Sequence, residues 1–216
     1  MVDRAVGVPF AKEGFPFIGA AAGGTLIAGW LGWALIAAAG AGLTLFVSWF
    51  FRNPARTVPQ GRGLVVAPGD GKVLAIEEEF EPRYLKARAI RVSIFLNVFD
   101  VHINRLPCEG RIEGVQYQPG QFLIASRPDA TLKNEQNAVM IKTVEGAKVL
   151  CVQVAGLIAR RIVCWVNPND HAVRGERYGL IRFGSRMDTF LPVGTVMQVA
   201  VGDRVKGGET VLGALR

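Results

Sequence analysis

The feature of this sequence that most restricts its fold is a long stretch without charge near the N-terminus. No Asp, Glu, Lys or Arg occurs between Gly14 and Phe51, and the stretch is rich in Ala, Gly, Leu, Ile, Phe and Trp. A single helix of this length would extend about 55 Å at about 1.5 Å per residue, well beyond a hydrocarbon thickness of about 30 Å. We therefore expect the helix to be broken.

The segment Gly29–Trp33 is the expected position of the break. Its two glycines allow a turn, and its two tryptophans favour a membrane interface. The pattern predicts two short antiparallel helices that form a membrane-associated hairpin within residues 1–52. Each helix is slightly shorter than a usual membrane span, so a spanning hairpin and an interfacial or re-entrant one both remain open. A buried helical hairpin in a soluble core is the further alternative.

Basic residues flank this stretch on both sides. Arg4 and Lys12 precede it, and Arg52, Arg56 and Arg62 follow it. The tendency of such residues to stay on the cytoplasmic side predicts a cell-membrane protein whose remaining domain lies on the cytoplasmic face. The net charge of +7 suits an anionic lipid surface. Nucleic acid is a weaker expectation, because the basic residues are dispersed and lack interleaved aromatic residues.

The pattern changes after the apolar stretch. Pro54 and Pro59 predict an extended linker over residues 53–63. Short β-like runs separated by Gly, Pro and polar turns then predict a mainly β domain over residues 64–216, either barrel-like or sandwich-like. Residues 121–136 are expected to form a loop or a short helix. The expected strands are Leu64–Val66, Lys72–Ile76, Ala89–Leu96, Gly110–Tyr117, Ala138–Thr143, Lys148–Ala155, Ile158–Val166, Leu180–Phe183, Thr195–Val199 and Thr210–Leu212.

Few side chains in this domain are suited to catalysis. The chain has two histidines: His102 lies in a polar cluster that ends at Arg105, and His171 lies in a loop-like segment. Asp70, between two glycines, is either a turn former or the carboxylate that orients a histidine. Neither histidine has metal-ligand spacing to cysteines or carboxylates, so no metal site is expected. The three cysteines, an odd number, are expected to be free thiols.

A serine follows a glycine at Gly184–Ser185, shortly before the strand-like Thr189–Leu191. The serine hydroxyl can attack the carbonyl that precedes it, which would cut the chain. Glycine before the serine leaves that carbonyl accessible. By itself the pair is far more typical of a plain turn.

An ordered set of motifs gives this serine its significance. The motifs are Trp49–Pro54, Ala67–Gly71, Phe95–Gly110, Val154–Ile162 and Phe183–Ser185. In this order they resemble the phosphatidylserine decarboxylase family in its short bacterial form. The resemblance extends from about Trp49 to the C-terminus.

The resemblance implies a proenzyme that cleaves itself between Gly184 and Ser185. The products would be a β chain (1–184) and an α chain (185–216) that form a heterodimer or a higher oligomer. Ser185 would become a pyruvoyl group, which forms a Schiff base with the amine of phosphatidylserine and accepts the electrons released with CO2. The product would be phosphatidylethanolamine, and neither a metal nor pyridoxal phosphate would be needed.

The resemblance also suggests roles for individual residues. Ser185, His102 and Asp70 are the expected catalytic residues, with Asp70 orienting His102. Many relatives carry a second histidine at the position of Arg105, and here we expect Arg105 to contact the lipid phosphate or the substrate carboxylate. If His102 serves decarboxylation alone, His171 is the candidate base for self-cleavage.

Two other functions remain open. One is a decarboxylase for a related serine phospholipid, such as an ether lipid. The other is a non-enzymatic membrane-anchored β-barrel adaptor or carrier-like protein, whose chain would stay uncut.

Overall fold

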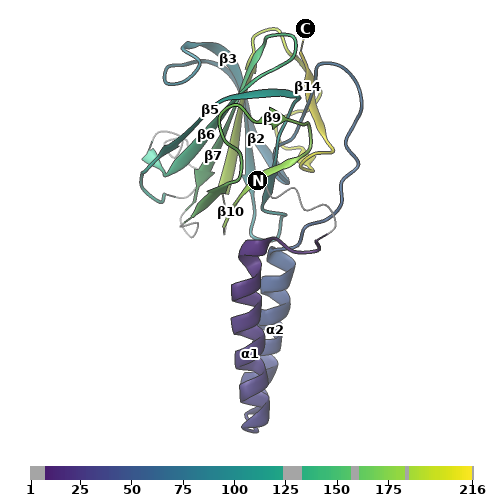
Figure 1. Cartoon of the computed structure of the whole chain (residues 1–216), viewed down its shortest axis with the longest axis vertical. Coiled ribbons are helices and arrows are strands. Elements are labelled where there is room, and N and C mark those ends of the chain that lie inside the picture. Colours follow the sequence, from purple (N-terminus) through teal and green to yellow (C-terminus); the bar gives the residue numbers. More distant parts are fainter. Residues whose placement is uncertain (1–7, 124–132, 157–160, 183–184, 216) are drawn as a thin grey trace. The chain divides into compact units, whose positions relative to one another are not determined.

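The computed structural model of the protein describes residues 8–123, 133–156, 161–182 and 185–215. These residues belong to two compact units, a helical unit that ends at Ala55 and a β unit that begins at Arg56. Figure 1 labels both helices and several of the strands, and each unit is considered by itself.

The helical unit is a hairpin. A short 3-10 turn, η1 (Lys12–Gly14), leads into α1 (Phe15–Trp30), and α2 (Ala34–Phe50) follows. The helices are separated at Gly32, whose φ of 75° lies in the left-handed region that glycine tolerates. They pack closely where Gly40 faces Thr25, since a Cβ added to Gly40 would lie 2.6 Å from Thr25 Oγ1. The predicted hairpin and the position of its break are confirmed.

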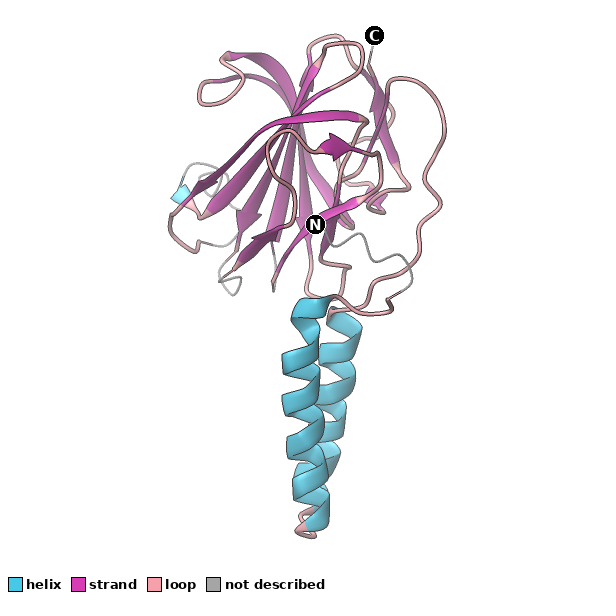
Figure 2. Cartoon of the chain, in the orientation of Figure 1, coloured by secondary structure: helices cyan, strands magenta, loops and turns pink. Residues whose placement is uncertain are grey.

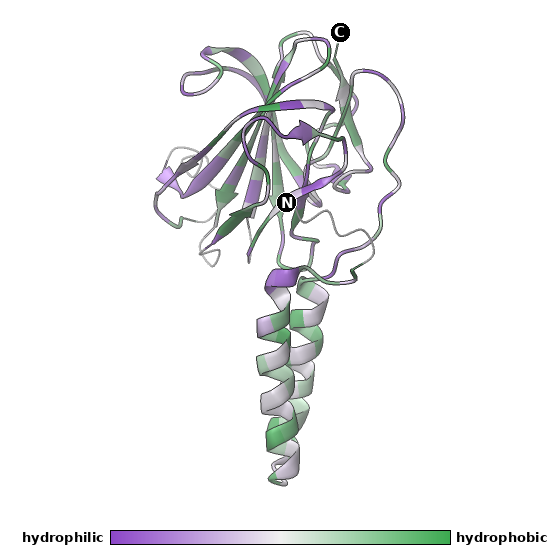
Figure 3. Cartoon of the chain, in the orientation of Figure 1, coloured by the Kyte–Doolittle hydropathy of each residue, from purple (hydrophilic) through white to green (hydrophobic). Residues whose placement is uncertain are grey.

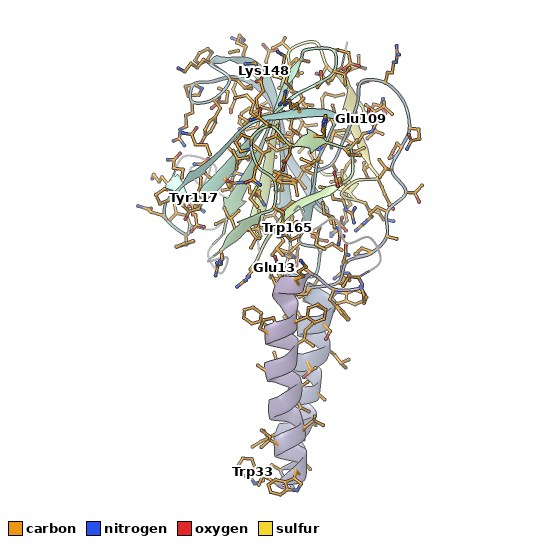
Figure 4. All side chains as sticks on the ribbon, viewed as in Figure 1. Glu13, Trp33, Glu109, Tyr117, Lys148 and Trp165 are labelled. Atoms are coloured by element: carbon orange, nitrogen blue, oxygen red, sulfur yellow. The ribbon has the colours of Figure 1, made fainter. Side chains whose placement is uncertain are left out.

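The two helices of the hairpin consist of residues of intermediate to high hydropathy, drawn white and green in Figure 3, and many large apolar side chains are exposed on them. Figure 4 places Glu13 and Trp33 at opposite ends of the helix pair. Helices α1 and α2 have 16 and 17 residues. No helix in the described part of the chain combines the length and the apolar character required to cross a membrane.

The β unit consists of antiparallel strands, drawn in magenta in Figure 2. Its main sheet is a curled half-barrel with the strand order β13-β2-β3-β11-β7-β6-β5-β9. Two three-stranded sheets have the orders β1-β14-β12 and β4-β10-β8. The strands are β1 (Leu64–Val66), β2 (Gly71–Glu81), β3 (Ala87–Leu96), β4 (Ile103–Arg105), β5 (Gly110–Gln118), β6 (Gln136–Lys142), β7 (Lys148–Ala155), β8 (Ile162–Cys164), β9 (His171–Ala172), β10 (Arg177–Ile181), β11 (Ser185–Pro192), β12 (Val196–Met197), β13 (Arg204–Val205) and β14 (Val211–Ala214).

The predicted mainly β class is confirmed, and the structure differs from the expected strands in several places: β2 is longer, β9 and β13 were not expected, and two differences concern the site. Strand β4 lies within the polar cluster around His102, where we expected no strand, and β11 begins at Ser185 itself, where a turn was the alternative interpretation. Both segments are buried, and pairing with neighbouring strands supplies the hydrogen bonds that their buried backbone groups require. Part of the expected loop at 121–136 and of the expected strand at 158–166 lies outside the described residues.

Strand β11 is central to the main sheet, with β3 on one side and β7 on the other. Met187 and Leu191 face the main hydrophobic core, whereas Phe190 belongs to a smaller cluster on the opposite face. Because side chains alternate along a strand, Ser185 points to the same interior as Met187. The fold thus directs the serine hydroxyl into the core side of the half-barrel.

Candidate active site

Ser185 is the first residue of β11 and is fully buried. It pairs with Leu96 on β3 and with Ala155 on β7, so its backbone is fixed from both sides. Its Oγ has no hydrogen-bond partner in the described structure. Leaving a buried hydroxyl unpaired costs about 1–3 kcal/mol, which singles out this atom as a candidate for a chemical role. Gly184, the other half of the predicted cleavage site, lies outside the described residues.

His102 lies directly before β4 and is 2% exposed. Its Nδ1 is 2.9 Å from the carbonyl oxygen of Asp100. A carbonyl can only accept, so Nδ1 carries the hydrogen and Nε2 of the neutral ring carries the lone pair. The carbonyl oxygen of His102 accepts a hydrogen bond from Ile181 N at 3.3 Å. His102 therefore lies beside the chain segment that leads to Ser185.

Asp70 lies in the turn that enters β2. Its carboxylate accepts hydrogen bonds from Arg56 Nη2, at 3.0 and 2.8 Å, and from Gly207 N at 2.8 Å. These contacts bind the turn to the β13 region and to the start of the β unit. The Nδ1 of His102, which we expected Asp70 to orient, is held by the Asp100 carbonyl. A contact between Asp70 and His102 stays a prediction.

Arg56 is a functional candidate whose place in the sequence does not reveal its contacts. We grouped it with the basic residues flanking the apolar stretch, but its side chain is only 7% exposed and pairs with Asp70. It also lies 3.8 Å from Glu209. No motif of the sequence indicated this contact, because Arg56 follows the Trp49–Pro54 motif and its partners lie far along the chain.

Arg105, at the end of β4, is buried, and its Nη1 donates to the Gly175 carbonyl at 2.9 Å. Burial, followed by the nearby cations Arg56 and Arg177, lowers the pKa of Arg105 to about 10. The carboxylates of Asp70 and Glu209 act in the opposite direction. Arg105 therefore stays protonated at neutral pH, and among the described residues that act on its pKa, the guanidinium groups of Arg56 and Arg177 outweigh the carboxylates of Asp70 and Glu209. Such an excess of positive charge suits an anionic ligand.

His171 lies at the other end of the sheet. It is exposed on the edge strand β9, where it pairs with Arg111 of β5. Across the sheet, Arg111 pairs with Lys142 of β6, and Lys142 pairs with Lys148 at the start of β7. Ser185 pairs with the opposite end of β7, at Ala155. Seven residues along a strand correspond to about 23 Å. Of the two histidines, His102 is the one whose backbone bonds to the segment that leads to Ser185.

A cavity of about 360 Å³ also opens at the far end, beside Thr143 and Arg174. Because it lies away from Ser185 and His102, we do not assign the chemistry to it. Among the described residues, no group of three or more His, Cys, Asp or Glu side chains could hold a metal ion. The thiols of Cys108, Cys151 and Cys164 are free.

Comparisons with known proteins identify the family of this chain. A family model for phosphatidylserine decarboxylase matches residues 43–213. The phosphatidylserine decarboxylase proenzyme of Nitrosomonas europaea is 51% identical over 206 residues, which cover 94% of this chain and 93% of that protein. The proenzyme of Syntrophus aciditrophicus is 48% identical over 204 residues, 94% of this chain and 96% of that protein. These matches do not favour the adaptor alternative, and they confirm the resemblance that the motifs indicated: the chain belongs to the phosphatidylserine decarboxylase family.

Proposed function

We propose that this chain is a proenzyme that cuts itself between Gly184 and Ser185 and then converts phosphatidylserine to phosphatidylethanolamine and CO2. The observation that carries the proposal is the fully buried, unpartnered Oγ of Ser185 at the start of β11. The relatives that match nearly the whole chain are named proenzymes, which supports processing of this kind.

Self-cleavage begins when Ser185 Oγ gives its proton to a base, for which we propose Nε2 of His102. Oγ then bonds to the carbonyl carbon of Gly184, the peptide C–N bond breaks, and the nitrogen takes up a proton, which leaves an ester. Removal of the Cα proton of Ser185 breaks its Cβ–Oγ bond, and the upstream chain departs as a carboxylate that retains Oγ. Tautomerisation and hydrolysis of the remaining dehydroalanine release ammonia and leave a pyruvoyl group on the α chain.

The surroundings of residue 185 fit such a group. Pairing of β11 with both β3 and β7 holds this position from both sides, so the new chain end stays in place after the cut. The pyruvoyl ketone supplies an acceptor for the electron pair that is released with CO2. This chemistry needs neither a metal ion nor pyridoxal phosphate.

The other site residues bind the substrate and move protons. We propose that Arg105 contacts the phosphate or carboxylate of the lipid head group, and that His102 donates a proton to the substrate carbon after CO2 has left. Asp70, anchored by Arg56, supplies the carboxylate that balances this cationic site. A related serine phospholipid, such as an ether lipid, would satisfy the same contacts.

We propose that the helical unit attaches the enzyme to the cytoplasmic face of the cell membrane. Large apolar side chains cover its surface, among them Trp30 at 86% and Leu35 at 87% exposure. A continuous apolar surface of this kind is typical of a lipid-contacting or protein-contacting segment. The hairpin would embed the enzyme where its substrate resides.

The test is CO2 release from vesicles that contain phosphatidylserine labelled in the serine carboxyl group. We expect the wild-type protein to consist of two chains and to release label, and Ser185→Ala to remain one chain and release none. Release of label by intact Ser185→Ala protein would contradict the proposal. Vesicles with an ether-linked serine lipid in place of the ester-linked one test the related substrate.

A further inference from the structure

Three buried amide side chains form a hydrogen-bonded chain in the interior of the half-barrel. Asn137 Nδ2 donates to Gln153 Oε1 at 2.9 Å, and Gln153 Nε2 donates to Asn104 Oδ1 at 2.8 Å. The three side chains come from β6, β7 and β4, and none is more than 3% exposed. The chain of donors ends at Asn104 Nδ2, which has no hydrogen-bond partner within the described residues.

The direction of this amide chain is fixed by the backbone around Gln153. Its Nε2 also faces the carbonyl oxygen of Val163 at 3.4 Å, and a carbonyl can only accept. Gly179 makes this approach possible, because a Cβ there would lie 2.9 Å from Gln153 Nε2 and 2.2 Å from the Val163 oxygen. With its nitrogen held on this side, Gln153 must donate to the oxygen of Asn104. The amide nitrogen of Asn104 is thus directed away from Gln153 as an unused donor.

The contacts of Asn104 place this donor over the inner face of β11. Its oxygen is bonded to Gln153, which pairs with Met187. Its nitrogen lies beside Gly69, since a Cβ added to Gly69 would be 3.6 Å from Asn104 Nδ2 and 3.2 Å from Leu96 Cδ2. Leu96 pairs with Ser185. The amide therefore extends from the Met187 row toward the Ser185 row, on the face to which the serine side chain points.

A second buried asparagine shows what a purely structural role requires. Asn134 uses both ends of its amide: Nδ2 donates to the carbonyls of Leu123 and Ala155, and Oδ1 accepts from Leu123 N. Asn104 is equally buried but keeps its nitrogen unpaired, which costs about 1–3 kcal/mol. The hydrogen bonds of Gln153 hold the Asn104 amide in one orientation, and its nitrogen is left unpaired in the uncut chain. Such a donor is suited to an acceptor atom that forms only during the reaction.

We propose that Asn104 Nδ2 stabilises the oxyanion that forms when Ser185 Oγ attacks the Gly184 carbonyl. In this step the Oγ–H bond breaks, the Oγ–C bond forms, and the π electrons of the carbonyl move to its oxygen, which accepts the Asn104 hydrogen bond. When the C–N bond breaks, the electron pair on this oxygen re-forms the C=O double bond, and the oxygen loses its negative charge. Gln153 and Asn137 act as positioning residues that keep the donor oriented. The proposal rests on the self-cleavage proposed above.

The test measures the rate of self-cleavage after pulse-labelled cell-free synthesis of the full chain. Asn104→Leu removes the donor at similar volume, and we expect it to slow cleavage about 100-fold, as loss of one oxyanion donor does in other enzymes. Asn104→Asp keeps the oxygen that Gln153 requires but donates only while its carboxyl is protonated. We therefore expect the cleavage rate of Asn104→Asp relative to wild type to rise as the pH falls. Thr195→Val, which removes a partly buried hydrogen bond to the Pro192 carbonyl at the far end of β11, is the control and should cleave normally.

Hydroxylamine treatment of the denatured, uncut chains separates the steps of the reaction. An effect on the first step leaves an amide that hydroxylamine does not cut, whereas an effect on the later elimination would leave an ester that it cuts. Soluble, folded Asn104→Leu and Asn104→Asp proteins that both cleave within twofold of wild type, or that accumulate the ester, would overturn the role of Asn104. If the wild-type chain itself stays uncut, the proposed function fails instead.

Discussion

Arg56 Nη2 lies 3.0 Å from Oδ1 and 2.8 Å from Oδ2 of Asp70, in an ion pair whose side chains are 7% and 16% exposed. Breaking a buried pair by removing one partner leaves an uncompensated charge and costs about 3 kcal/mol or more. The pair holds the turn before β2 against the β13 region, close to the row of Ser185.

Arg56→Ala is therefore expected to lower the free energy of unfolding by about 3 kcal/mol and to slow self-cleavage. Stability should be measured by urea unfolding in the Ser185→Ala background, where the chain stays whole. Arg62→Ala is the matched control, because Arg62 is an exposed basic residue of the same segment and should change neither quantity. Equal effects of the two substitutions would show that the ion pair has no special role.

His102→Ala is expected to lower decarboxylation at least about 100-fold, since a positioned acid–base group contributes about 10² to 10⁴ in rate. The rate should be expressed per matured α chain, so that a change in cleavage does not enter it. His171→Ala serves as the control, because His171 is exposed at the far end of the sheet. Full activity of the His102 variant would remove this residue from the site.

Arg105→Met is expected to raise thermal stability and to raise KM for phosphatidylserine. Burial lowers the pKa of Arg105 to about 10, so the folded protein holds this proton less tightly than the unfolded chain does. The charge therefore disfavours folding at neutral pH, and this cost is relieved only as the pH rises above about 10. Melting curves and lipid titrations check both effects, with Arg105→Lys as the variant that keeps the charge. A less stable Arg105→Met protein with unchanged KM would contradict the assignment.

Leu35→Glu tests the proposed membrane attachment. A charge at this exposed position of the hairpin should weaken flotation with anionic vesicles while self-cleavage continues, because the proposed cleavage residues belong to the β unit. Val144→Glu, at an exposed apolar position of the β unit, should leave flotation unchanged. Equal flotation of the Leu35 variant and the wild type would exclude this face of the hairpin from lipid binding.

The sequence was sufficient to predict the features that depend on local patterns. The helical hairpin follows from the uncharged stretch and from Gly32, and most strands of the β unit follow from short apolar runs between turns. Ser185 and His102 were selected by their motifs; the structure buries both, and the backbone of His102 bonds to Ile181, four residues before Ser185.

Contacts between distant parts of the chain could not be predicted in this way. Arg56 looks like one of several flanking cations until the fold brings it to Asp70 and Glu209. Likewise, Asn104 lies in a polar segment that has no strand pattern, and only the contacts from Gln153, 49 residues away, show why it is buried. Burial of polar groups depends on partners from other strands, and a single sequence does not reveal those partners.

The most direct test of the account is the intact mass of the purified protein under denaturing conditions. The account predicts two chains, a β chain that ends at Gly184 and an α chain that begins at position 185 and is lighter by one ammonia than its unmodified sequence. The same measurement on Ser185→Ala should give one full-length chain. A single unmodified chain in active wild-type protein would contradict the central claim.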